Sequence, residues 1–350
     1  MPASSRPSPS HKLYVSWAQT IADVLETNWY RTEPTIRWGK EQNSWNTWNT
    51  TEALLDYTRI VKDRRYLPEL QKIVANRPLI EQALSDGNDD AGWAGIALVK
   101  AARLFREKSH LAQAETVFSE MTRYWDDTCG GGVWWNHGRT YKNAITNELF
   151  LTLAMLLHRE TRKKMYLDWA KREWDWFLRS GMINRDHLIN DGLHDCKNNG
   201  GSTWTYNQGV ILGGLVDLHR ATKDGACLEQ ACRIAGAVME RMSPARNGVA
   251  ILQEAGDEPN TDQQQFKGIF VRYLATLAGS LPEEGSPGRA AIRQFIMGNA
   301  DAVISSARGN GHLVNVYWHE TERPGIFNAI TQTAGLDLLN AAVLLNSGSS

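Results

Sequence analysis

Residues 161–180 read TRKKMYLDWAKREWDWFLRS, and nine of these twenty side chains are charged. Residues 203–218 read TWTYNQGVILGGLVDL, where Asp217 is the one charged side chain. Both stretches carry apolar residues at helical spacing. A helix that is apolar on all sides is buried, whereas a charged amphipathic helix faces water on one side. The two stretches therefore predict one outer and one inner helix.

The same alternation of charged and uncharged helices runs along the whole chain. Apolar periodicity predicts twelve helices, at 13–29, 47–62, 66–84, 90–107, 111–124, 143–159, 163–180, 205–220, 227–242, 262–278, 289–307 and 328–345. The even-numbered helices are the uncharged, inner ones, and they begin at intervals of roughly 45 to 65 residues. Six hairpins of one inner and one outer helix close most simply into a ring. The predicted fold is therefore all-α, an (α/α)6 barrel in a single domain, residues 13–346, after a flexible segment, residues 1–12.

The composition excludes several functional classes. Lys and Arg number 38 against 39 Asp and Glu, so the net charge is -1 and the basic surface of a nucleic-acid-binding protein is missing. The balanced charge fits an uncharged partner, and the 14 Trp, which outnumber both Tyr and Phe, give a surplus of flat ring faces. No stretch has the length and apolarity of a membrane span. The sequence leaves the oligomeric state open.

The termini and cysteines give a prediction of compartment. The first twelve residues are polar and lack the apolar core of a secretory signal, so a cytoplasmic protein is favoured, although a secreted chain without its signal would read the same. The four cysteines match neither a CxxC pair nor a zinc ribbon, and we expect them to be free, buried thiols.

The loops that lead into the inner helices collect Trp, Gly, Asn and acidic residues, as in SDGNDDAGW and CGGGVWWNHGRTYKN. In a barrel of helical hairpins these loops meet at one mouth, where the inner helices begin. A concave site of aromatic and neutral polar groups suits a sugar. One of Trp134, Trp135 and Trp204 is expected to stack on a ligand there.

Asp89 and Asp90, followed by Trp93, are the strongest catalytic candidates. Glycoside hydrolysis needs two carboxyl groups, and a retaining enzyme needs them about 5 to 5.5 Å apart, which neighbouring residues can reach. We expect helix N–H groups to hold Asp89 ionised as a nucleophile, and the adjacent anion to raise the pKa of Asp90 for an acid. The alternative is that both residues merely cap the helix, because Asn and Asp are preferred there. A similar pair, Asp126-Asp127, is assigned to loop structure.

No metal or cofactor is predicted. His187, Asp191, His194 and Asp195 are close in sequence, but their spacing matches no common metal motif. The glycines of QGVILGG do not follow a strand and do not match a nucleotide-binding pattern, so they indicate close helix packing.

In this order and spacing, NDDAGW, CGGGVWWN with YKNAITNELF, TWTYNQGVILGGL and DQQQFKGIFVRYL resemble glycoside hydrolase family 76, the α-1,6-mannanases. The resemblance runs from about Trp17 to Leu345. It implies an (α/α)6 barrel and a retaining, endo-acting enzyme on α-1,6-linked mannan or manno-oligosaccharides. Asp89 then matches the nucleophile and Asp90 the acid/base. The positions that match the family's substrate-binding motifs are Tyr141, Lys142, Asn143, Tyr206, Asn207, Gln208, Asp262, Phe266 and Lys267.

Three alternatives remain at this stage. A transglycosidase would pass the sugar to another sugar instead of water. A sugar epimerase on the same barrel would use bases such as His137, His194 and His319. A non-catalytic carbohydrate-binding protein would use the aromatic residues without needing both aspartates.

Overall fold

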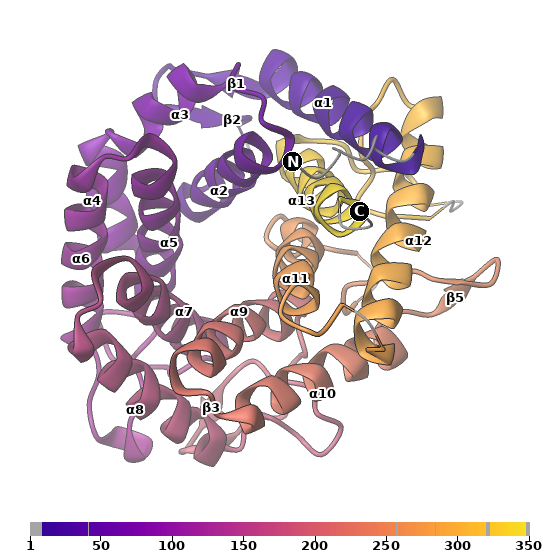
Figure 1. The fold of residues 1–350 in the computed structure, drawn as a ribbon. Helices are drawn as coiled ribbons and strands as arrows, with labels where there is room; N and C mark the ends of the chain where they lie inside the picture. Colours follow the sequence, from indigo (N-terminus) through magenta and orange to yellow (C-terminus); the bar gives the residue numbers. More distant parts are fainter. Residues whose placement is uncertain (1–8, 41, 257, 284, 320–322, 348–350) are drawn as a thin grey trace, which may run out of the picture.

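Inner and outer helices alternate along the chain in the computed structural model, which describes residues 9–40, 42–256, 258–283, 285–319 and 323–347. The inner helices are α2 (Ser44–Val61), α5 (Asn88–Phe105), α7 (Ala144–Thr161), α9 (Thr205–Thr222), α11 (Gln263–Ala278) and α13 (Ala329–Asn346). Each packs on the next, and α13 packs on α2, so the ring closes (Figure 1). The predicted (α/α)6 barrel is confirmed.

The outer ring surrounds these six helices. It consists of α1 (Pro9–Trp29), α3 (Leu67–Val74), α4 (Arg77–Asp86), α6 (Lys108–Thr122), α8 (Lys164–Ser180), α10 (Gly225–Arg241) and α12 (Pro287–Gly309). Helix α1 begins at Pro9, so residues 9–12 of the predicted flexible segment are helical, while residues 1–8 lie outside the described part of the chain. No helix of the described residues is long and apolar enough to cross a membrane.

The described residues hold thirteen α-helices rather than twelve, because the helix predicted at 66–84 is two helices. The Asn76 side chain accepts a hydrogen bond from the Leu79 N–H at 3.0 Å and caps α4. Pro78 follows in the first turn of α4, where its missing N–H costs nothing. A proline inside a continuous helix would remove a backbone hydrogen bond, so the chain ends α3 and starts α4 there.

Three β-hairpins, each formed by two strands of two residues, lie in the loops of the described chain. They are β1 (Tyr30–Arg31) with β2 (Arg37–Trp38), β3 (Leu193–His194) with β4 (Lys197–Asn198), and β5 (Ala245–Arg246) with β6 (Val249–Ala250). In the sequence, the short apolar stretches at 249–252 and 313–318 are candidates for strands in the loops. The first contains β6, and the second holds no strand.

Glycine lets the inner helices approach one another closely. A Cβ atom on Gly209 would lie 2.6 Å from Cα of Phe270, and one on Gly268 would lie 2.6 Å from Cα of Ala334. Close packing was expected for the glycines of α9, and Gly268 of α11 adds a second close contact within the ring. We call the end where the inner helices begin the N-terminal mouth and the opposite end the C-terminal mouth.

Candidate active site

The first turn of α5 is anchored to the loop before α7. The Asn88 N–H donates to the Trp135 carbonyl oxygen at 2.9 Å, and the Asn88 side chain donates to the Trp134 carbonyl oxygen at 2.7 Å. The tryptophan loop therefore fixes where α5 begins and where the next two side chains, Asp89 and Asp90, are presented at the N-terminal mouth.

Gly87 leaves room for the two carboxyl groups. A Cβ atom at this position would lie 2.8 Å from Oδ1 of Asp89 and 3.8 Å from Oδ2 of Asp90. One oxygen of each carboxyl group thus lies within 4 Å of the same point. Any side chain at residue 87 would displace the Asp89 carboxyl group.

The pKa of Asp89 is raised, mainly because the carboxyl group is buried. The Trp135 side chain and the backbone N–H groups of Asp89 and Asp90 act in the opposite direction, and the nearby charge of Asp262 adds to the increase. The sequence predicted that N–H groups would favour the ionised form, and they do, but burial outweighs them. Oδ1 of Asp89 is buried and has no hydrogen-bond partner among the described residues.

The pKa of Asp90 is raised more strongly than that of Asp89. Burial is again the largest cause, followed by the charge of Asp89 and then that of Asp86. Two adjacent carboxyl groups cannot both ionise easily, so the pair loses its first proton at Asp89 and keeps the second on Asp90. This is the order of proton loss that the roles predicted from the sequence require, and the roles themselves stay a prediction.

An aromatic wall stands beside the pair, and its five members come from α2, α5, α11 and the start of α9. The Tyr206 and Phe266 rings stack with centroids 3.7 Å apart. The Trp45 ring lies 6.2 Å from that of Trp93 and 6.1 Å from that of Phe266. The Trp204 ring centroid lies 6.0 Å from that of Phe266. Trp93 and Phe266 are buried, whereas Trp45, Trp204 and Tyr206 are partly exposed and offer ring surface of the kind that packs against sugars.

Asp262 belongs to the same mouth. It accepts a hydrogen bond from the Trp45 indole nitrogen at 3.1 Å, and its charge affects both Asp89 and Asp90. Burial raises its pKa as well. The residues at the starts of α2, α5 and α11 thus meet at one mouth, as the placement of the loops predicted.

The two loop tryptophans differ in their surroundings. The Trp134 indole donates to Oδ2 of Asp126 at 2.7 Å, and the Lys142 ammonium lies 4.7 Å from the centre of its ring. Trp135 is 41% exposed, with its ring edge-on to Tyr141. Trp134 therefore holds the loop in place, whereas Trp135 interacts with Asp89 and also exposes ring surface to a ligand.

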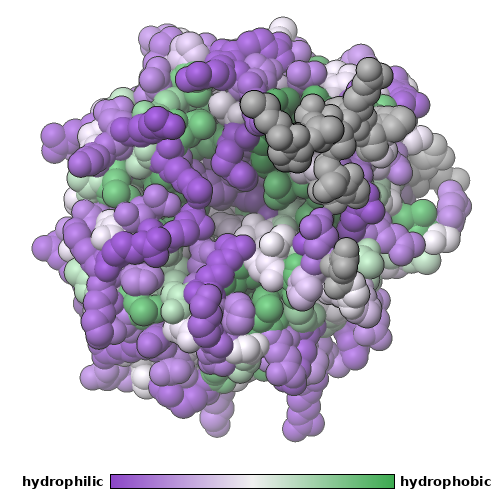
Figure 2. Space-filling model, in the orientation of Figure 1, coloured by the Kyte–Doolittle hydropathy of each residue, from purple (hydrophilic) through white to green (hydrophobic). Residues whose placement is uncertain are grey.

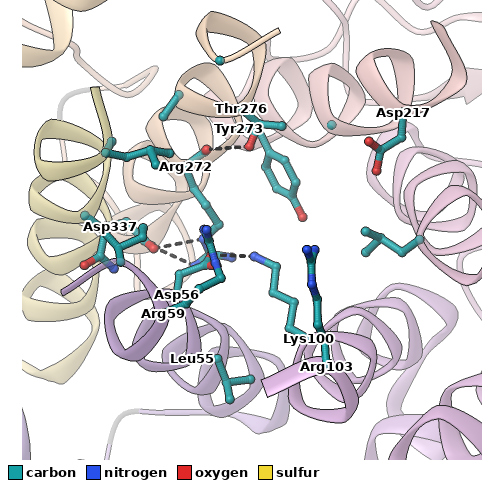
Figure 3. Close-up of a pocket in the computed structure, with 18 of the residues that line it drawn as sticks. Leu55, Asp56, Arg59, Lys100, Arg103, Asp217, Arg272, Tyr273, Thr276 and Asp337 are labelled. Atoms are coloured by element: carbon teal, nitrogen blue, oxygen red, sulfur yellow. Dashed lines mark hydrogen bonds and ion pairs between the residues drawn. The ribbon is translucent and has the colours of Figure 1, made fainter. Parts of the chain in front are cut away.

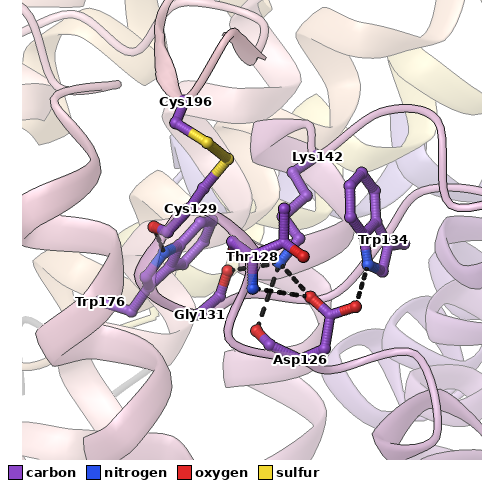
Figure 4. Close-up of a disulfide and its surroundings, with 8 residues drawn as sticks. All are labelled: Asp126, Thr128, Cys129, Gly131, Trp134, Lys142, Trp176 and Cys196. Carbon is purple, nitrogen blue, oxygen red and sulfur yellow. Dashed lines mark hydrogen bonds and ion pairs between the residues drawn. A yellow bond between two sulfur atoms is a disulfide. The ribbon is translucent and has the colours of Figure 1, made fainter.

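Lys142 is buried and used entirely inside the protein. Its ammonium group donates to the carbonyl oxygens of Thr128 at 2.7 Å and Gly131 at 2.6 Å, and it pairs with Asp126 at 3.0 Å (Figure 4). Asp126 therefore serves the loop structure, as predicted. Lys142 acts on the site through the tryptophan loop.

Three other predicted binding residues also bond to the protein itself. The Asn143 side chain caps α7 by accepting from the Thr146 N–H. The Gln208 amide exchanges hydrogen bonds with the backbone of Ile189 at 2.7 and 2.8 Å. Lys267 donates to the Val316 carbonyl oxygen at 2.7 Å, and burial lowers its pKa to about 7. Their contact with substrate stays a prediction.

Tyr141 and Asn207 differ from these three residues, and Tyr206 belongs to the aromatic wall described above. The Tyr141 hydroxyl donates to Asp191 at 2.5 Å and accepts from Asn199 at 2.9 Å. Asn207 is buried, and neither atom of its amide has a partner among the described residues. It is the predicted binding residue whose hydrogen-bonding capacity is most clearly unused.

The sequence analysis missed several groups around the mouth. Glu148 is buried, both of its carboxyl oxygens lack a partner in the described structure, and burial raises its pKa well above the usual value. Glu254 accepts from the Thr205 N–H at 3.1 Å, and burial raises its pKa to about 7. A lone acid in an otherwise apolar run, as in NELFLTLAML, was the available signal for Glu148. Trp45 stood in a tryptophan-rich loop, RWGKEQNSWNTW, that the sequence placed at the mouth.

A disulfide joins Cys129 to Cys196, so the expectation of four free cysteines is wrong. The two residues are 67 positions apart, and no sequence spacing signals such a pair. Figure 4 shows the bridge beside Gly131 and Trp176, next to the loop that Lys142 holds. Cys227 and Cys232 are free.

We expect the double variant Cys129→Ser/Cys196→Ser to lose about 2–4 kcal/mol of unfolding free energy, because the cross-link restricts the unfolded chain. Urea unfolding followed by circular dichroism measures this loss. Reduction of the unmodified protein should reproduce it, whereas Cys232→Ser should leave the unfolding midpoint nearly unchanged. An unchanged midpoint after verified reduction of the bridge would contradict the prediction.

Among the described residues, no three His, Cys, Asp or Glu side chains are grouped so that they could hold a metal ion. Of the histidine-rich segment, Asp191 instead accepts the bond from Tyr141, and His194 and Asp195 are exposed at the tip of the β3–β4 hairpin.

Comparison with known proteins places this site in context. The yeast-type mannan endo-1,6-alpha-mannosidase DCW1 of Eremothecium gossypii is 31% identical over 279 residues, 74% of this chain, and that of Saccharomyces cerevisiae is 29% identical over 331 residues, 84% of this chain. The chain spans 61% and 70% of these two relatives. A solved structure of an inactive α-1,6-mannanase variant from Salegentibacter, with two consecutive aspartates replaced by alanine and α-1,6-mannotetrose bound, has a TM-score of 0.82 at 24% identity, covering 95% of this chain and 99% of the other.

The match to a family model decides the classification. The model described as "Glycosyl hydrolase family 76" matches residues 12–349, nearly the whole chain. Together with the relative at 31% identity, this match confirms the resemblance seen in the sequence. The chain belongs to glycosyl hydrolase family 76.

Proposed function

We propose that this protein is a retaining glycoside hydrolase that cleaves α-1,6-mannosidic bonds inside a mannan chain. The observation that carries the proposal is the pair Asp89 and Asp90, adjacent at a helix N-terminus, with different affinities for a proton, beside an aromatic wall. The names of the relatives, mannan endo-1,6-alpha-mannosidases, support the linkage and the internal point of cleavage.

The chemistry assigns one role to each carboxyl group. The Asp89 carboxylate attacks the anomeric carbon of the mannose and forms a glycosyl ester, while Asp90 gives its proton to the departing glycosidic oxygen. Asp90, now ionised, then takes a proton from water, and the hydroxide displaces Asp89 from the sugar. Two inversions at the same carbon leave the configuration unchanged.

The short reach between the two groups supports a retaining rather than an inverting reaction. An inverting enzyme separates its carboxyl groups by about 6.5 to 9.5 Å to admit water, whereas a retaining enzyme holds them about 5 to 5.5 Å apart. These oxygens of Asp89 and Asp90 lie 2.8 and 3.8 Å from one point, so they are at most about 6.6 Å apart, which excludes all but the lower limit of the inverting range. The inactive double-aspartate variant of the Salegentibacter mannanase supports the same pair.

The experiment is digestion of linear α-1,6-mannan with separation of the products by size. We expect a ladder of oligosaccharides early in the reaction, because internal cleavage shortens chains before it releases monomer. Proton NMR of the first products should show the α-anomer. An α-1,2-linked mannan serves as the matched control and should remain intact. Release of mannose alone would indicate end-acting cleavage, products longer than the substrate would indicate a transglycosidase, and binding without turnover would indicate a carbohydrate-binding protein.

We further infer a single catalytic domain, residues 13–346, that works where disulfides persist. Disulfides are rare in the cytoplasm and common in oxidising compartments, so the Cys129–Cys196 bridge favours a location outside the cytoplasm over the cytoplasmic one expected from the sequence. Thiol labelling of the protein taken from its own cell, before and after reduction, tests this: four reactive cysteines without reduction would contradict it.

The two carboxyl groups predict a bell-shaped pH dependence. Activity needs Asp89 ionised and Asp90 protonated, so it falls as the pH drops below the pKa of Asp89 and as it rises above that of Asp90. Both limbs lie at higher pH than for exposed aspartates, because burial raises both pKa values.

A Trp135→Phe variant should shift only the acidic limb of the pH profile of activity. The Trp135 side chain lowers the pKa of Asp89, so its loss raises that pKa and shifts the acidic limb to higher pH. The alkaline limb, set by Asp90, should stay in place and serves as the internal control. A profile of kcat/KM against pH measures both, and equal movement of the two limbs would contradict this assignment.

A further inference from the structure

A second cavity opens at the C-terminal mouth, away from the catalytic pair. It has a volume of about 770 Å³ and is lined by residues from the C-terminal halves of all six inner helices. Figure 2, viewed along the barrel, shows a hollow near the centre with hydrophilic side chains around it. Arg103, which lines this cavity, lies 13 residues after Asp90 on α5, which corresponds to about 20 Å along the helix. The cavity is therefore distinct from the proposed active site.

The lining of this cavity is strongly basic. Seven arginines and one lysine face three aspartates, although the whole chain has a net charge of -1. The buried Glu52 beneath them reduces the excess of positive charge to four. A size of a few hundred cubic ångströms is that of a site for a small molecule.

The acidic groups of the cavity are already paired. Arg272 lies between Glu52 and Asp337, and Lys100 pairs with Glu52 at 2.6 Å. Arg272 also bonds Asp337 at 2.8 Å and Lys100 pairs with Asp56 at 2.5 Å, and both of these pairs are visible in Figure 3. Arg159 and Arg220 share Asp217. These pairs leave no acid of the lining for further cations.

Arg103 has no hydrogen bond or ion pair among the described residues. Figure 3 shows its guanidinium group in the cavity near the Lys100 ammonium group. Glu52 and Asp56 balance the charge of Lys100, whereas the charge of Arg103 has no counter-ion among the described residues. A guanidinium group presents a planar fork of donors that matches phosphate and carboxylate groups.

The helix dipoles balance part of the positive charge at this mouth. Each helix C-terminus carries about half a negative charge, so six of them oppose roughly three positive charges at this mouth. Arg103 and Arg220 stand in the last turns of α5 and α9, where they interact well with these dipoles. The dipoles do not, however, explain an unused donor deeper in the cavity.

That donor is the Tyr273 hydroxyl. The side chain is 5% exposed, and its hydroxyl is buried without a hydrogen-bond partner in the described structure. Figure 3 shows the hydroxyl pointing into the cavity, on the side where Lys100 and Arg103 reach in. Leaving a buried hydroxyl unpaired costs about 1–3 kcal/mol, and an oxygen-bearing ligand removes that cost.

We propose that the C-terminal mouth binds a small oxyanion with two or more negative charges, held by Arg103, Lys100 and the Tyr273 hydroxyl. The chemistry fits phosphate esters and polycarboxylates alike, since both present paired oxygens to a guanidinium fork. The site is independent of mannan cleavage, because none of the three residues is near the N-terminal mouth.

Isothermal titration calorimetry with pyrophosphate, citrate and uncharged glucose tests this proposal. We expect saturable one-to-one binding of pyrophosphate or citrate that weakens steeply as sodium chloride is raised, and none of glucose. Tighter pyrophosphate binding identifies a phosphate site, and tighter citrate binding a carboxylate site. Absence of saturable binding of both anions in the millimolar range would overturn the proposal.

Variants locate the binding. Arg103→Ala should weaken it about tenfold or more, because a charge-assisted bond is lost, and Tyr273→Phe should weaken it by less. Arg179→Ala is the matched control, since Arg179 also stands exposed in the last turn of a helix, α8, but outside the cavity. Arg103→Ala should keep full mannan hydrolysis, which shows that the variant is folded. Equal weakening by Arg103→Ala and Arg179→Ala would mean general charge attraction, and would overturn the assigned site.

Discussion

Replacing Asp89 by asparagine should abolish turnover of every mannoside, with a loss on the order of 10⁴ to 10⁶ in kcat. Asparagine has nearly the same shape but cannot form the glycosyl ester, so neither step of the reaction has a nucleophile. A better leaving group does not help, because the missing group is the attacking one. Rates on linear α-1,6-mannan and on an activated aryl α-mannoside measure the loss.

The fold of this variant is expected to be intact. Asp89 stands in the first turn of α5, where asparagine is also well tolerated, so a purely structural role would cost less than about 0.5–2 kcal/mol. Circular dichroism and thermal unfolding check this. Near-normal activity in a folded Asp89→Asn variant would show that the nucleophile lies elsewhere, and Asp262 at the same mouth would be the next candidate.

The fold could be predicted from the sequence because burial and charge repeat along the chain. A helix such as α9, with Asp217 as its one acidic residue, fits only inside the ring, and α8, with its many charges, fits only outside. The helix break at Asn76 and Pro78 was visible as a local signal but was overridden by the apolar periodicity on either side. At this point the capping residue and the proline, and not the longer apolar pattern, determine where one helix ends and the next begins.

The active site was predictable in place but not in detail. Adjacent aspartates before a buried helix point to its N-terminus, and the barrel puts every such N-terminus at one mouth. Which polar residues face the ligand depends on their partners in the folded chain. Lys142 bonds backbone groups of the loop just before it, and Gln208 bonds the backbone of Ile189, 19 residues earlier. The bridge between Cys129 and Cys196 depends on two loops that meet only in the folded chain.

An Asp90→Asn variant should fail differently from Asp89→Asn. Mannan cleavage should fall by about 10²–10⁴, the usual contribution of a general acid, because the departing sugar oxygen leaves without a proton. An aryl mannoside whose leaving group needs no proton should still form the glycosyl ester. The second step then becomes slow, because no base activates water, and the ester accumulates. Stopped-flow measurement should show a burst of the aryl group followed by a slow steady rate.

Azide and pH separate this role of Asp90 from a structural one. Azide needs no base, so added azide should speed the second step and give α-mannosyl azide, with the configuration of the substrate retained. The alkaline limb of the pH profile should also disappear, because the group that must stay protonated is gone, whereas the acidic limb set by Asp89 should remain. A variant that merely lost a helix-capping group would show neither the burst nor the rescue. If azide left the rate unchanged while the alkaline limb persisted, another buried acid at this mouth, such as Glu148 or Glu254, would have to supply the proton.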